Sequence, residues 1–512
     1  MLRTAGAISP RTLINPSSPP TALTWLSPEI PIRALINRLR NASKYGMLVE
    51  TGAPVYLRRT WGTAMKHRYK AKLSSVQIIA LGFFIMIGLG TALLMLPISS
   101  HDPNGASFGD ALFAATSASC VTGLVPQDTG TYWTTFGQIV LILLIQTGGL
   151  GFMSIATLFL LLLRQRLGLR QREVVVDSVS YDRLGGFVPF IRLVFLGTFL
   201  AEGLGAVLLS IRFVPQLGWG KGIYYGVWHS ISAFCNAGFD LMGPVSGEYS
   251  SFTAYAGDPL VSLTICALIL IGGTGFLVWE DLVRNTYHWR RYRLQTKVVL
   301  WMNLLLTAGG GLAFFLLERN NLGAGKPLGE QILAALFDAV TPRTAGFNST
   351  DTGALTSGSL LLTIMFMFTG GSPGSTAGGV KTTTIFVILL HAFSGVRRER
   401  SANAFGRSIG DDALKKATAV VYTNLLLALV GTIAICAIQP LSLTQALFET
   451  FSAIGTAGMT MGITRDLLPA SRLIIVFLMY CGRVGSISFA VALLEKRATP
   501  PVTLPREDIT IG

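Results

Sequence analysis

Charged side chains are scarce in this sequence. Asp, Glu, Lys and Arg together account for 13% of its 512 residues, whereas 51% are hydrophobic; a soluble domain carries about a quarter charged residues. The five cysteines lie at spacings that fit neither a disulfide framework nor a zinc site. Five histidines and no pair of acids inside an apolar run give little material for a membrane-embedded hydrolase. These shortages exclude an ordinary soluble enzyme and predict an integral membrane protein that is not an enzyme.

Long apolar runs are what the sequence has instead. A membrane-crossing helix needs about 20 predominantly apolar residues, and windows of that length begin near Val76, Trp133, Phe187, Pro259, Lys297, Ser359, Leu414 and Ser471. Between the members of each successive pair lies a shorter, semi-apolar stretch, of a length typical of re-entrant helices: residues 108–121, 224–236, 329–343 and 442–455. The sequence therefore predicts an all-α membrane protein with eight spans and four re-entrant pore helices.

The basic residues are distributed unevenly along the chain. Of the 41 Lys and Arg residues, 31 fall in five segments: residues 1–74, 164–186, 284–297, 397–416 and 496–512. These segments share one side of the membrane only if the spans number eight. Because short cytoplasmic loops collect basic residues, we expect a multi-pass protein of the cell membrane with both termini in the cytoplasm. The formal charge of +15 then indicates topology and contact with membrane lipids, and no nucleic-acid partner is expected.

Four segments of the chain repeat one pattern. They read FAATSASCVTG, WHSISAFCNAG, LFDAVTPRTAG and FETFSAIGTAG, and they align on Gly123, Gly238, Gly346 and Gly458 at intervals of 115, 108 and 112 residues. A second glycine-rich pattern follows each of them: QTGGLGF, LIGGTGF, FTGGSPG and YCGRVGS. A period of this kind indicates a repeated structural unit. We expect four membrane-pore-membrane units around a pseudo-fourfold axis, each made of a span, a re-entrant helix, an extended glycine loop and a second span.

The expected domain boundaries follow from these units. They are a basic cytoplasmic N-terminal tail (1–74), four repeats (75–165, 187–284, 297–391 and 414–495) and a cytoplasmic C-terminus (496–512). The role of the tail, and whether its first 28 residues are a cleaved transit sequence, stays open.

The aligned segments are suited to binding a cation. Re-entrant helices around one axis direct their partially negative C-terminal ends toward its centre, and extended backbone after them would line the axis with carbonyls. Glycine readily adopts the positive φ that turns a carbonyl inward. Four tight turns at the rim of a helix bundle are the alternative. The expected selectivity filter comprises Val121, Thr122, Gly123, Asn236, Ala237, Gly238, Thr344, Ala345, Gly346, Thr456, Ala457 and Gly458, with potassium at the carbonyls of the four glycines.

This arrangement resembles the Trk/Ktr/HKT superfamily of potassium transporters over residues 75–495, and it is most similar to the Ktr-type (KtrB) membrane subunit because no extra spans precede the first unit. The resemblance implies potassium uptake through a channel-like pore without a bound cofactor. Glycine at all four aligned positions goes with potassium in this family, whereas sodium-preferring relatives have serine at the first. The resemblance also implies a homodimer, bound on its cytoplasmic face to a ring of nucleotide-binding regulatory subunits of the KtrA type.

In the third unit the second span is interrupted by FTGGSPGSTAGGVKTTT, residues 368–384, which is too rich in glycine for a continuous helix. By resemblance this is an intramembrane gating loop, comprising Gly370, Gly371, Ser372, Pro373, Gly374, Ser375, Thr376, Ala377, Gly378 and Gly379, with Lys381 at its edge. Arg483 lies in the last span, where a charge is costly and should face the axis; the family carries an arginine here, which implies a barrier in the pore. An ion pair with a buried acid such as Glu202 is the alternative.

Other interpretations of the sequence stay open. A sodium or non-selective monovalent cation transporter could share this fold. A secondary carrier would be built on inverted repeats, whereas these repeats run in parallel. His229 and Arg343 lie on re-entrant helices, where packing or capping is as good an account as function. Four acids that follow the aligned glycines could concentrate cations or form turns: Asp128, Asp240, Asp351 and Asp466.

Overall fold

The computed structural model describes residues 75–151, 154, 187–286, 288–398 and 401–485. The chain divides into two compact parts, Met1–Lys72 and Leu73–Gly512, and every described residue belongs to the part that begins at Leu73. The expected N-terminal tail, the basic loop 164–186 and the expected C-terminus lie outside the described residues. So do the ends expected for repeats 1 and 4, residues 155–165 and 486–495.

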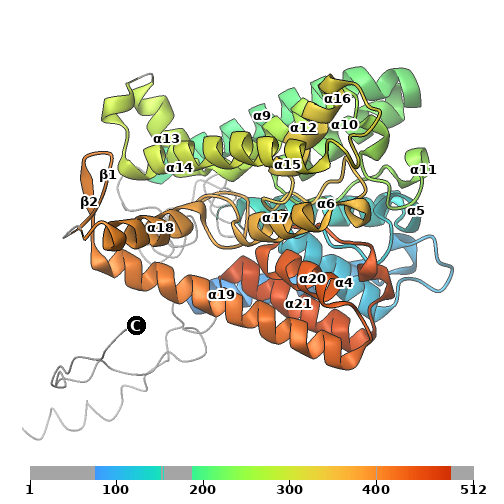
Figure 1. The fold of residues 1–512 in the computed structure, drawn as a ribbon. Helices are drawn as coiled ribbons and strands as arrows, with labels where there is room; N and C mark the ends of the chain where they lie inside the picture. The colour runs from blue at the N-terminus through green and yellow to red at the C-terminus, as the bar shows by residue number, and fades with distance from the viewer. Residues whose placement is uncertain (1–74, 152–153, 155–186, 287, 399–400, 486–512) are drawn as a thin grey trace, which may run out of the picture. The chain divides into compact units, whose positions relative to one another are not determined.

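Helices occupy the places where spans and re-entrant helices were expected (Figure 1). The first unit contains α3 (Ser75–Leu94), α4 (Phe108–Ser119) and α6 (Thr135–Leu150). The second contains α9 (Phe187–Leu217), α10 (Trp219–Phe234), α12 (Pro259–Thr274) and α13 (Phe276–Asn285). The third contains α14 (Leu294–Leu304), a π-helical turn η4 (Leu305–Gly309), α15 (Gly310–Glu318), α16 (Leu328–Val340), α17 (Ser357–Phe368) and α18 (Thr382–Val396). The fourth contains α19 (Asp411–Ile438), α20 (Leu443–Gly455) and α21 (Pro469–Val484).

Short elements fill the connections between these helices. They are the helical turns α5 (Thr129–Tyr132) and α11 (Gly243–Ser246), and the 3-10 turns η1 (Pro97–Ser99), η2 (Thr253–Tyr255), η3 (Trp289–Arg291), η5 (Thr352–Ala354) and η6 (Ile463–Asp466). Strands β1 (Ala402–Ala404) and β2 (Arg407–Ile409) form an antiparallel hairpin between α18 and α19.

The four units pack as a closed ring. Within each unit the short helix expected to be re-entrant, α4, α10, α16 or α20, packs against the helices before and after it. Between units, the helix that follows it packs against the short helix of the next unit: α6 on α10, α12 on α16, α17 on α20, and α21 on α4. Because the last of these contacts joins the fourth unit to the first, α21 lies beside α4 although the two helices are at opposite ends of the described chain (Figure 1).

A buried aromatic fixes each of the four short helices, and a side-chain cap begins two of them, α4 and α20. Ser107 caps α4 by accepting a hydrogen bond from the Asp110 amide at 3.1 Å, and Ser442 with Gln445 forms a capping box at the start of α20. Such caps satisfy amides that have no partner within the helix. The aromatic residue that recurs in the repeat is fully buried in every unit: Phe113, Trp228, Phe337 and Phe448. The repeated aromatic is therefore a core position.

Four helices are long and apolar enough to cross a membrane: α3, α9, α14 with α15, and α19; the bent pair of α12 and α13 would be a fifth. The sequence predicted eight spans, and in the described part of the chain α6, α17, α18 and α21 are shorter. The long helices present apolar side chains outward, with Leu204 60% and Ile433 70% exposed. Such surface is unfavourable in water and suits contact with lipid.

The second glycine-rich pattern marks the place where the second helix of a unit touches the end of a short helix. A Cβ built on Gly148 would lie 2.1 Å from the carbonyl oxygen of Ser119, one on Gly272 would lie 1.9 Å from that of Phe234, and one on Gly482 would lie 2.2 Å from that of Ile454. These three oxygens belong to equivalent residues, four before the aligned glycines. Glycine is needed here because no side chain fits between the backbones.

The same pattern ends the helix in three units. Gly151, Gly275 and Gly485 follow α6, α12 and α21 with φ of 79°, 98° and 93°, and a positive φ does not continue a right-handed helix. In the second unit, α13 turns 90° from α12 at this glycine. A break in a span was expected in the third unit, and the bend between α12 and α13 adds one in the second. There the glycines that allow the close approach are followed by one that stops the helix.

Replacing Gly272 with alanine should destabilise the protein. The added Cβ would overlap the Phe234 carbonyl oxygen, and overpacking of a close-packed interior costs about 1–3 kcal/mol. Thermal unfolding of detergent-purified protein, followed by loss of the monodisperse peak in size-exclusion chromatography, should occur at a lower temperature. Gly203→Ala on α9 is the matched control, since nothing lies within 4 Å of a Cβ there. Equal midpoints for the two variants would contradict the close-approach explanation.

Candidate functional site

The residues expected to form the filter share an unusual backbone conformation. The first residue of each triplet has a positive φ although none is glycine: 56° at Val121, 59° at Asn236, 69° at Thr344 and 50° at Thr456. The aligned glycines also have positive φ, at 96°, 69°, 79° and 80° for Gly123, Gly238, Gly346 and Gly458. Two left-handed residues separated by one other turn the chain away from the helix axis in the same manner in all four units.

The four glycines lie next to one another in cyclic order, and we call this set the glycine ring. A Cβ built on Gly123 would lie 2.5 Å from the Ala237 oxygen, one on Gly238 2.4 Å from the Ala345 oxygen, and one on Gly346 2.8 Å from the Ala457 oxygen. The ring closes at Gly458, whose Cβ would lie 2.2 Å from the Thr122 oxygen. Each aligned glycine therefore meets the carbonyl that precedes the glycine of the next unit.

Hydrogen bonds from the short helices hold these segments in place. The backbone carbonyl of Ser117 accepts from the Thr122 amide at 2.8 Å, and equivalent bonds join Ala237 to Ser232 and Ala457 to Ser452. A hydroxyl four residues after the buried aromatic adds a second bond in three units. Ser117 Oγ accepts from the Gly123 amide at 3.0 Å, Ser232 Oγ donates to the Phe239 oxygen at 2.6 Å and Thr341 Oγ1 donates to the Phe347 oxygen. The recurring serines of the repeat are thus part of the support of the glycine ring.

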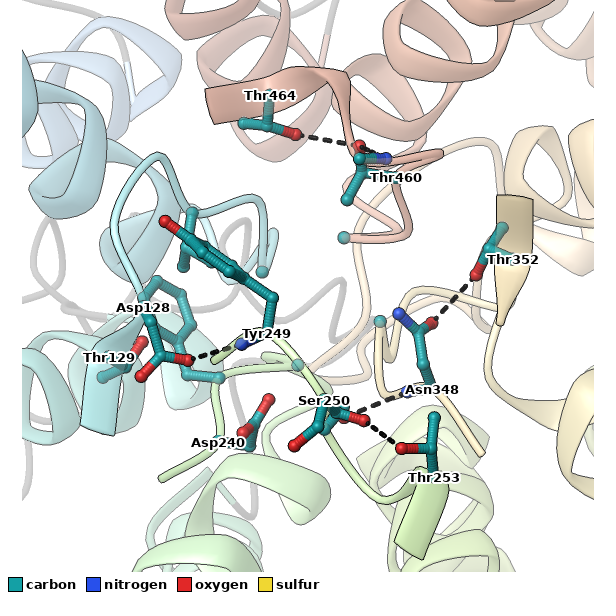
Figure 2. Close-up of a pocket in the computed structure, with 18 of the residues that line it drawn as sticks. Asp128, Thr129, Asp240, Tyr249, Ser250, Thr253, Asn348, Thr352, Thr460 and Thr464 are labelled. Carbon is teal, nitrogen blue, oxygen red and sulfur yellow. Dashed lines mark hydrogen bonds between the residues drawn. The ribbon is translucent and has the colours of Figure 1, made fainter. Parts of the chain in front are cut away.

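A cavity of about 350 Å³ opens from the glycine ring, and we call it the vestibule. All four ring glycines line it, and its wall is made by the residues that follow them in each unit. Figure 2 shows oxygen-bearing side chains from all four units around this space, among them Asp128, Tyr249, Asn348 and Thr460. The vestibule therefore combines a floor of close-packed backbone with a polar wall.

Three of the four expected acids line the vestibule, namely Asp128, Asp240 and Asp351, whereas Asp466 is not among its lining residues. Asp128 also caps α5 by accepting from the Thr131 amide at 2.9 Å. Asp351 likewise caps η5 by accepting from the Gly353 amide at 2.9 Å. The two explanations weighed for these acids, turn formation and a negative wall, thus apply together for Asp128 and Asp351.

Two vestibule residues, Tyr249 and Arg465, were not singled out from the sequence. Tyr249 lies in the stretch inserted in the second unit, and its amide donates to Asp128 Oδ1 at 3.1 Å. Its ring lies 4.7 Å from the guanidinium carbon of Arg465 in the fourth unit. This cation–π contact connects the second and fourth units across the vestibule. The insertion itself was the available signal, but its length gave no hint of which residues face the cavity.

The expected gating residues form one segment between α17 and α18, which we call the crossing segment (residues 369–381). It contacts residues that precede the ring glycines. Thr376 Oγ1 donates to the side chain of Asn236 at 3.0 Å, and a Cβ on Gly378 would lie 2.1 Å from Thr456 Oγ1. Because the vestibule is lined by the glycines and the residues after them, the crossing segment lies at the opposite end of the filter segments.

Many backbone hydrogen bonds fix the crossing segment. The Ser372 amide donates to the Gly273 oxygen at 3.0 Å, the Phe276 amide donates to the Gly374 oxygen at 2.8 Å, and the Gly370 amide donates to the Val380 oxygen at 2.8 Å. Lys381 Nζ donates to the Ala377 oxygen at 2.8 Å and thereby closes the segment on itself. An interrupted helix at membrane depth is tolerated only when its backbone groups find such partners.

Arg483 contacts backbone carbonyls of two other units. Its guanidinium donates to the Thr376 oxygen in the crossing segment and to the Gly148 and Gly149 oxygens at the end of α6. Glu202, the acid considered as an alternative partner, accepts a hydrogen bond from Gln146 at 3.3 Å. Carbonyls at a helix C-terminus carry partial negative charge and are suitable partners for a buried cation. Arg483 thus joins three units on the side of the crossing segment.

His229 and Arg343 have partners within the protein. His229 Nε2 accepts from the Leu241 amide at 3.0 Å, and its Nδ1 lies 2.7 Å from the Tyr225 oxygen, so the neutral ring donates from Nδ1. Arg343 donates from its guanidinium to Thr307 and Asn303 at the π-helical turn between α14 and α15. Both residues therefore connect a short helix, or the residues just after it, to a neighbouring part of the protein.

This geometry can be compared with known proteins. Residues 47–498 match the TrkH family, described as cation transport proteins. The chain belongs to this family. It is 38% identical over 458 residues to the potassium/sodium uptake protein NtpJ of Enterococcus hirae, covering 88% of this chain and 100% of that one. It is 42% identical over 415 residues to the Ktr system potassium uptake protein B of Bacillus subtilis, covering 81% and 91%.

A solved structure agrees at the level of the fold. The crystal structure of the potassium transporter TrkH from Vibrio parahaemolyticus superposes with a TM-score of 0.65, covering 90% of this chain and 96% of that one at 18% identity. The family match and the Ktr-system relative, together with this fold, confirm the resemblance inferred from the glycine repeat. This member of the TrkH family is a multi-pass membrane protein of a transporter family rather than of an enzyme family.

Acidification should weaken cation binding at the vestibule through Asp240. Burial, together with the neighbouring Asp128 carboxylate, raises the pKa of Asp240 to about 7. Asp240 is therefore charged above pH 7 and becomes neutral as the pH falls through 7, so its attraction for a cation is present at pH 8 and lost at pH 6. The apparent affinity for rubidium in uptake assays should fall roughly threefold over this range.

The control for this pH effect lies in the same loop. Asp240→Asn should give a rubidium affinity that is low and nearly independent of pH between 6 and 8. Glu248→Gln removes an exposed acid that does not line the vestibule, and this variant should keep the pH dependence of the parent protein. A pH dependence that persists in Asp240→Asn would contradict the assignment.

Proposed function

We propose that this protein takes up potassium across the cell membrane through a pore whose selectivity filter is the glycine ring with its neighbouring carbonyls. The observation that carries the proposal is the meeting of four separate chain segments, each with the same pair of positive φ values, at the floor of one polar cavity. Main-chain carbonyls can replace the hydration shell of a hard monovalent cation. The C-terminal ends of four helices add favourable partial charge at this place.

The names of relatives support this substrate. Two proteins at 42% and 35% identity are Ktr system potassium uptake proteins B, from Bacillus subtilis and Vibrio alginolyticus. The printed name of the Enterococcus hirae relative includes sodium as well as potassium, which keeps sodium transport as the second candidate. Glycine at all four ring positions favours potassium, and the membrane potential would drive entry with about 2.3 kcal/mol per charge per 100 mV.

The ratio of rubidium to sodium uptake by reconstituted vesicles should fall in Gly123→Ser. The new side chain would meet the Ala237 oxygen at a backbone φ of 96° that disfavours it, so the spacing of the carbonyls must change. The matched control is Gly109→Ser in the same unit, where a Cβ meets only the Ser107 side chain at 3.9 Å and the ratio should stay at its parent value. A ratio unchanged in Gly123→Ser would count against the filter.

The crossing segment serves as a gate, and Arg483 serves as its latch. The segment lies next to Asn236 and Thr456 at the helix end of the filter and is held there by one guanidinium that also binds the first unit. A cation leaving the ring toward this side meets both a folded backbone segment and a positive charge. Both would slow conduction.

Loss of this latch should increase transport. Arg483→Gln removes the charge, the direct hydrogen bond to the Thr376 carbonyl and the contacts to the Gly148 and Gly149 carbonyls, so initial rubidium uptake per transporter should rise several-fold. Arg472→Gln is the control, because Arg472 lies on the same helix but pairs with Asp110 at the start of α4; its initial rate should match the parent. A slower or unchanged rate in Arg483→Gln, at equal reconstitution, would refute the gate.

The finer arrangement is proposed from the distribution of charge and from the relatives. Eight spans around a pseudo-fourfold axis place both termini in the cytoplasm, the vestibule outside and the crossing segment inside. The relatives named as parts of a Ktr system favour an assembly in which this chain is a homodimeric membrane subunit beneath which a ring of KtrA-type nucleotide-binding subunits regulates the gate.

A further inference from the structure

One position of the repeat is apolar in the first unit and polar in the other three. It directly follows the buried aromatic of each short helix and is occupied by Ala114 on α4, His229 on α10, Asp338 on α16 and Glu449 on α20. The side chains are at most 6% exposed. Burying such polar groups is costly unless hydrogen bonds compensate, so their partners indicate what they are for.

In the fourth unit the partners lie on the vestibule wall. Glu449 Oε2 accepts from Thr460 Oγ1 at 2.9 Å, and Glu449 Oε1 accepts from Thr464 Oγ1. The two threonines are also bonded to each other at 3.0 Å, and Thr460 Oγ1 accepts from the Gly462 amide at 3.0 Å. One buried carboxylate thus holds the first turn of chain that leaves the glycine ring.

The second and third units use the same construction with other chemistry. Both oxygens of Asp338 accept from Thr350 Oγ1, at 3.0 and 3.1 Å. In the second unit His229 Nε2 accepts from the Leu241 amide. The bonded residues follow the ring glycine by two and six positions in the fourth unit, by four in the third and by three in the second. Each bond therefore connects the middle of a short helix to the residues that follow the ring glycine of the same unit, which we call the exit segment of that unit.

The first unit has no polar side chain at this position, and its exit segment is held from another unit. Asp128, five residues after Gly123, accepts from the Tyr249 amide of the second unit at 3.1 Å. Ala114 contributes only apolar packing. The exit segments of the second, third and fourth units are thus held by a residue of the same unit, and that of the first unit is held by a residue of the second.

We propose that Glu449, Asp338 and His229 are positioning residues for ion selectivity, which hold the exit segments of the filter and so fix the spacing of the carbonyls at the glycine ring. This rests on the proposed function of that ring. Because the bonded residues lie only two to six positions after the ring glycine, a displaced exit segment transmits its movement to the ring carbonyls. Cations of similar charge differ in the carbonyl spacing they require.

Glu449 gives the sharpest test, because its carboxylate makes two contacts with the wall. In proteoliposomes, the ratio of rubidium to sodium uptake should fall about tenfold in Glu449→Leu, which corresponds to about 1.4 kcal/mol in relative ion binding. Glu449→Gln keeps an acceptor oxygen and should restore much of the ratio. Thr464→Val removes one donor from the wall without changing the helix interior, so it carries the test if Glu449→Leu does not fold; its ratio should lie between those of the parent and Glu449→Leu.

The matched control is the neighbouring residue on the same helix. Thr450 is equally buried and hydrogen-bonded, but its hydroxyl contacts Thr432 of α19 and its own helix rather than the vestibule wall. Thr450→Val should therefore lower stability without moving the ratio. A merely structural role of Glu449 predicts proportional losses of rubidium and sodium uptake at a constant ratio, and that result would overturn the proposal. An unchanged ratio in Gly123→Ser would refute the proposed filter itself. A changed ratio in Gly123→Ser beside an unchanged one in Glu449→Leu would refute only the positioning role.

Discussion

Everything in this fold is arranged around the mutual contact of four glycine backbones. Each ring glycine meets the carbonyl of its neighbour so closely that a single Cβ would come within 2.8 Å of it or less. Contact at this distance excludes side chains and brings carbonyls together whose dipoles repel one another unless a cation lies among them. A protein can hold such an arrangement only if rigid elements support it from behind. The buried aromatics, the short helices with their caps and the second glycine patterns all provide this support.

The support has a measurable structure in hydrogen bonds. The first residue of each filter triplet adopts a left-handed conformation that costs a non-glycine residue roughly 1–2 kcal/mol, and this occurs at Val121, Asn236, Thr344 and Thr456. The cost is offset by amides that return to the short helix, as at Thr122, Ala237 and Ala457. Where the second helix of a unit passes the same helix end, glycine again permits direct backbone contact. The glycine ring is therefore the inner edge of a closely packed wall rather than a loop at its surface.

Much of this architecture could be predicted from the sequence, because a pattern that is weak in any one segment recurs in four. The four aligned glycines, the short helices and the interruption after Phe368 all lie where the pattern placed them. The pattern did not by itself reveal a second role of its glycines: Gly151 and Gly275, at the end of the pattern, also end α6 and α12. It missed contacts between units, such as Tyr249 with Arg465, since nothing local in either segment specifies a partner more than 200 residues away. The polar residues at 229, 338 and 449 were visible in the alignment, yet their differing chemistry concealed their equivalence.

Fusing four units in one chain allows each to specialise while the ring stays intact. The second unit contributes an insertion that reaches the vestibule, the third a crossing segment in place of a continuous helix, and the fourth an arginine where the first two have glycine. These features meet. Thr376 of the third unit donates to Asn236 of the second and accepts from Arg483 of the fourth, which also binds the end of α6 in the first. A shift of the crossing segment therefore changes contacts at Asn236 and Thr456, the residues that begin two of the filter triplets, and through Arg483 it changes contacts at the end of α6. In such an arrangement the proposed gate and the proposed filter share side chains, so opening one alters the support of the other.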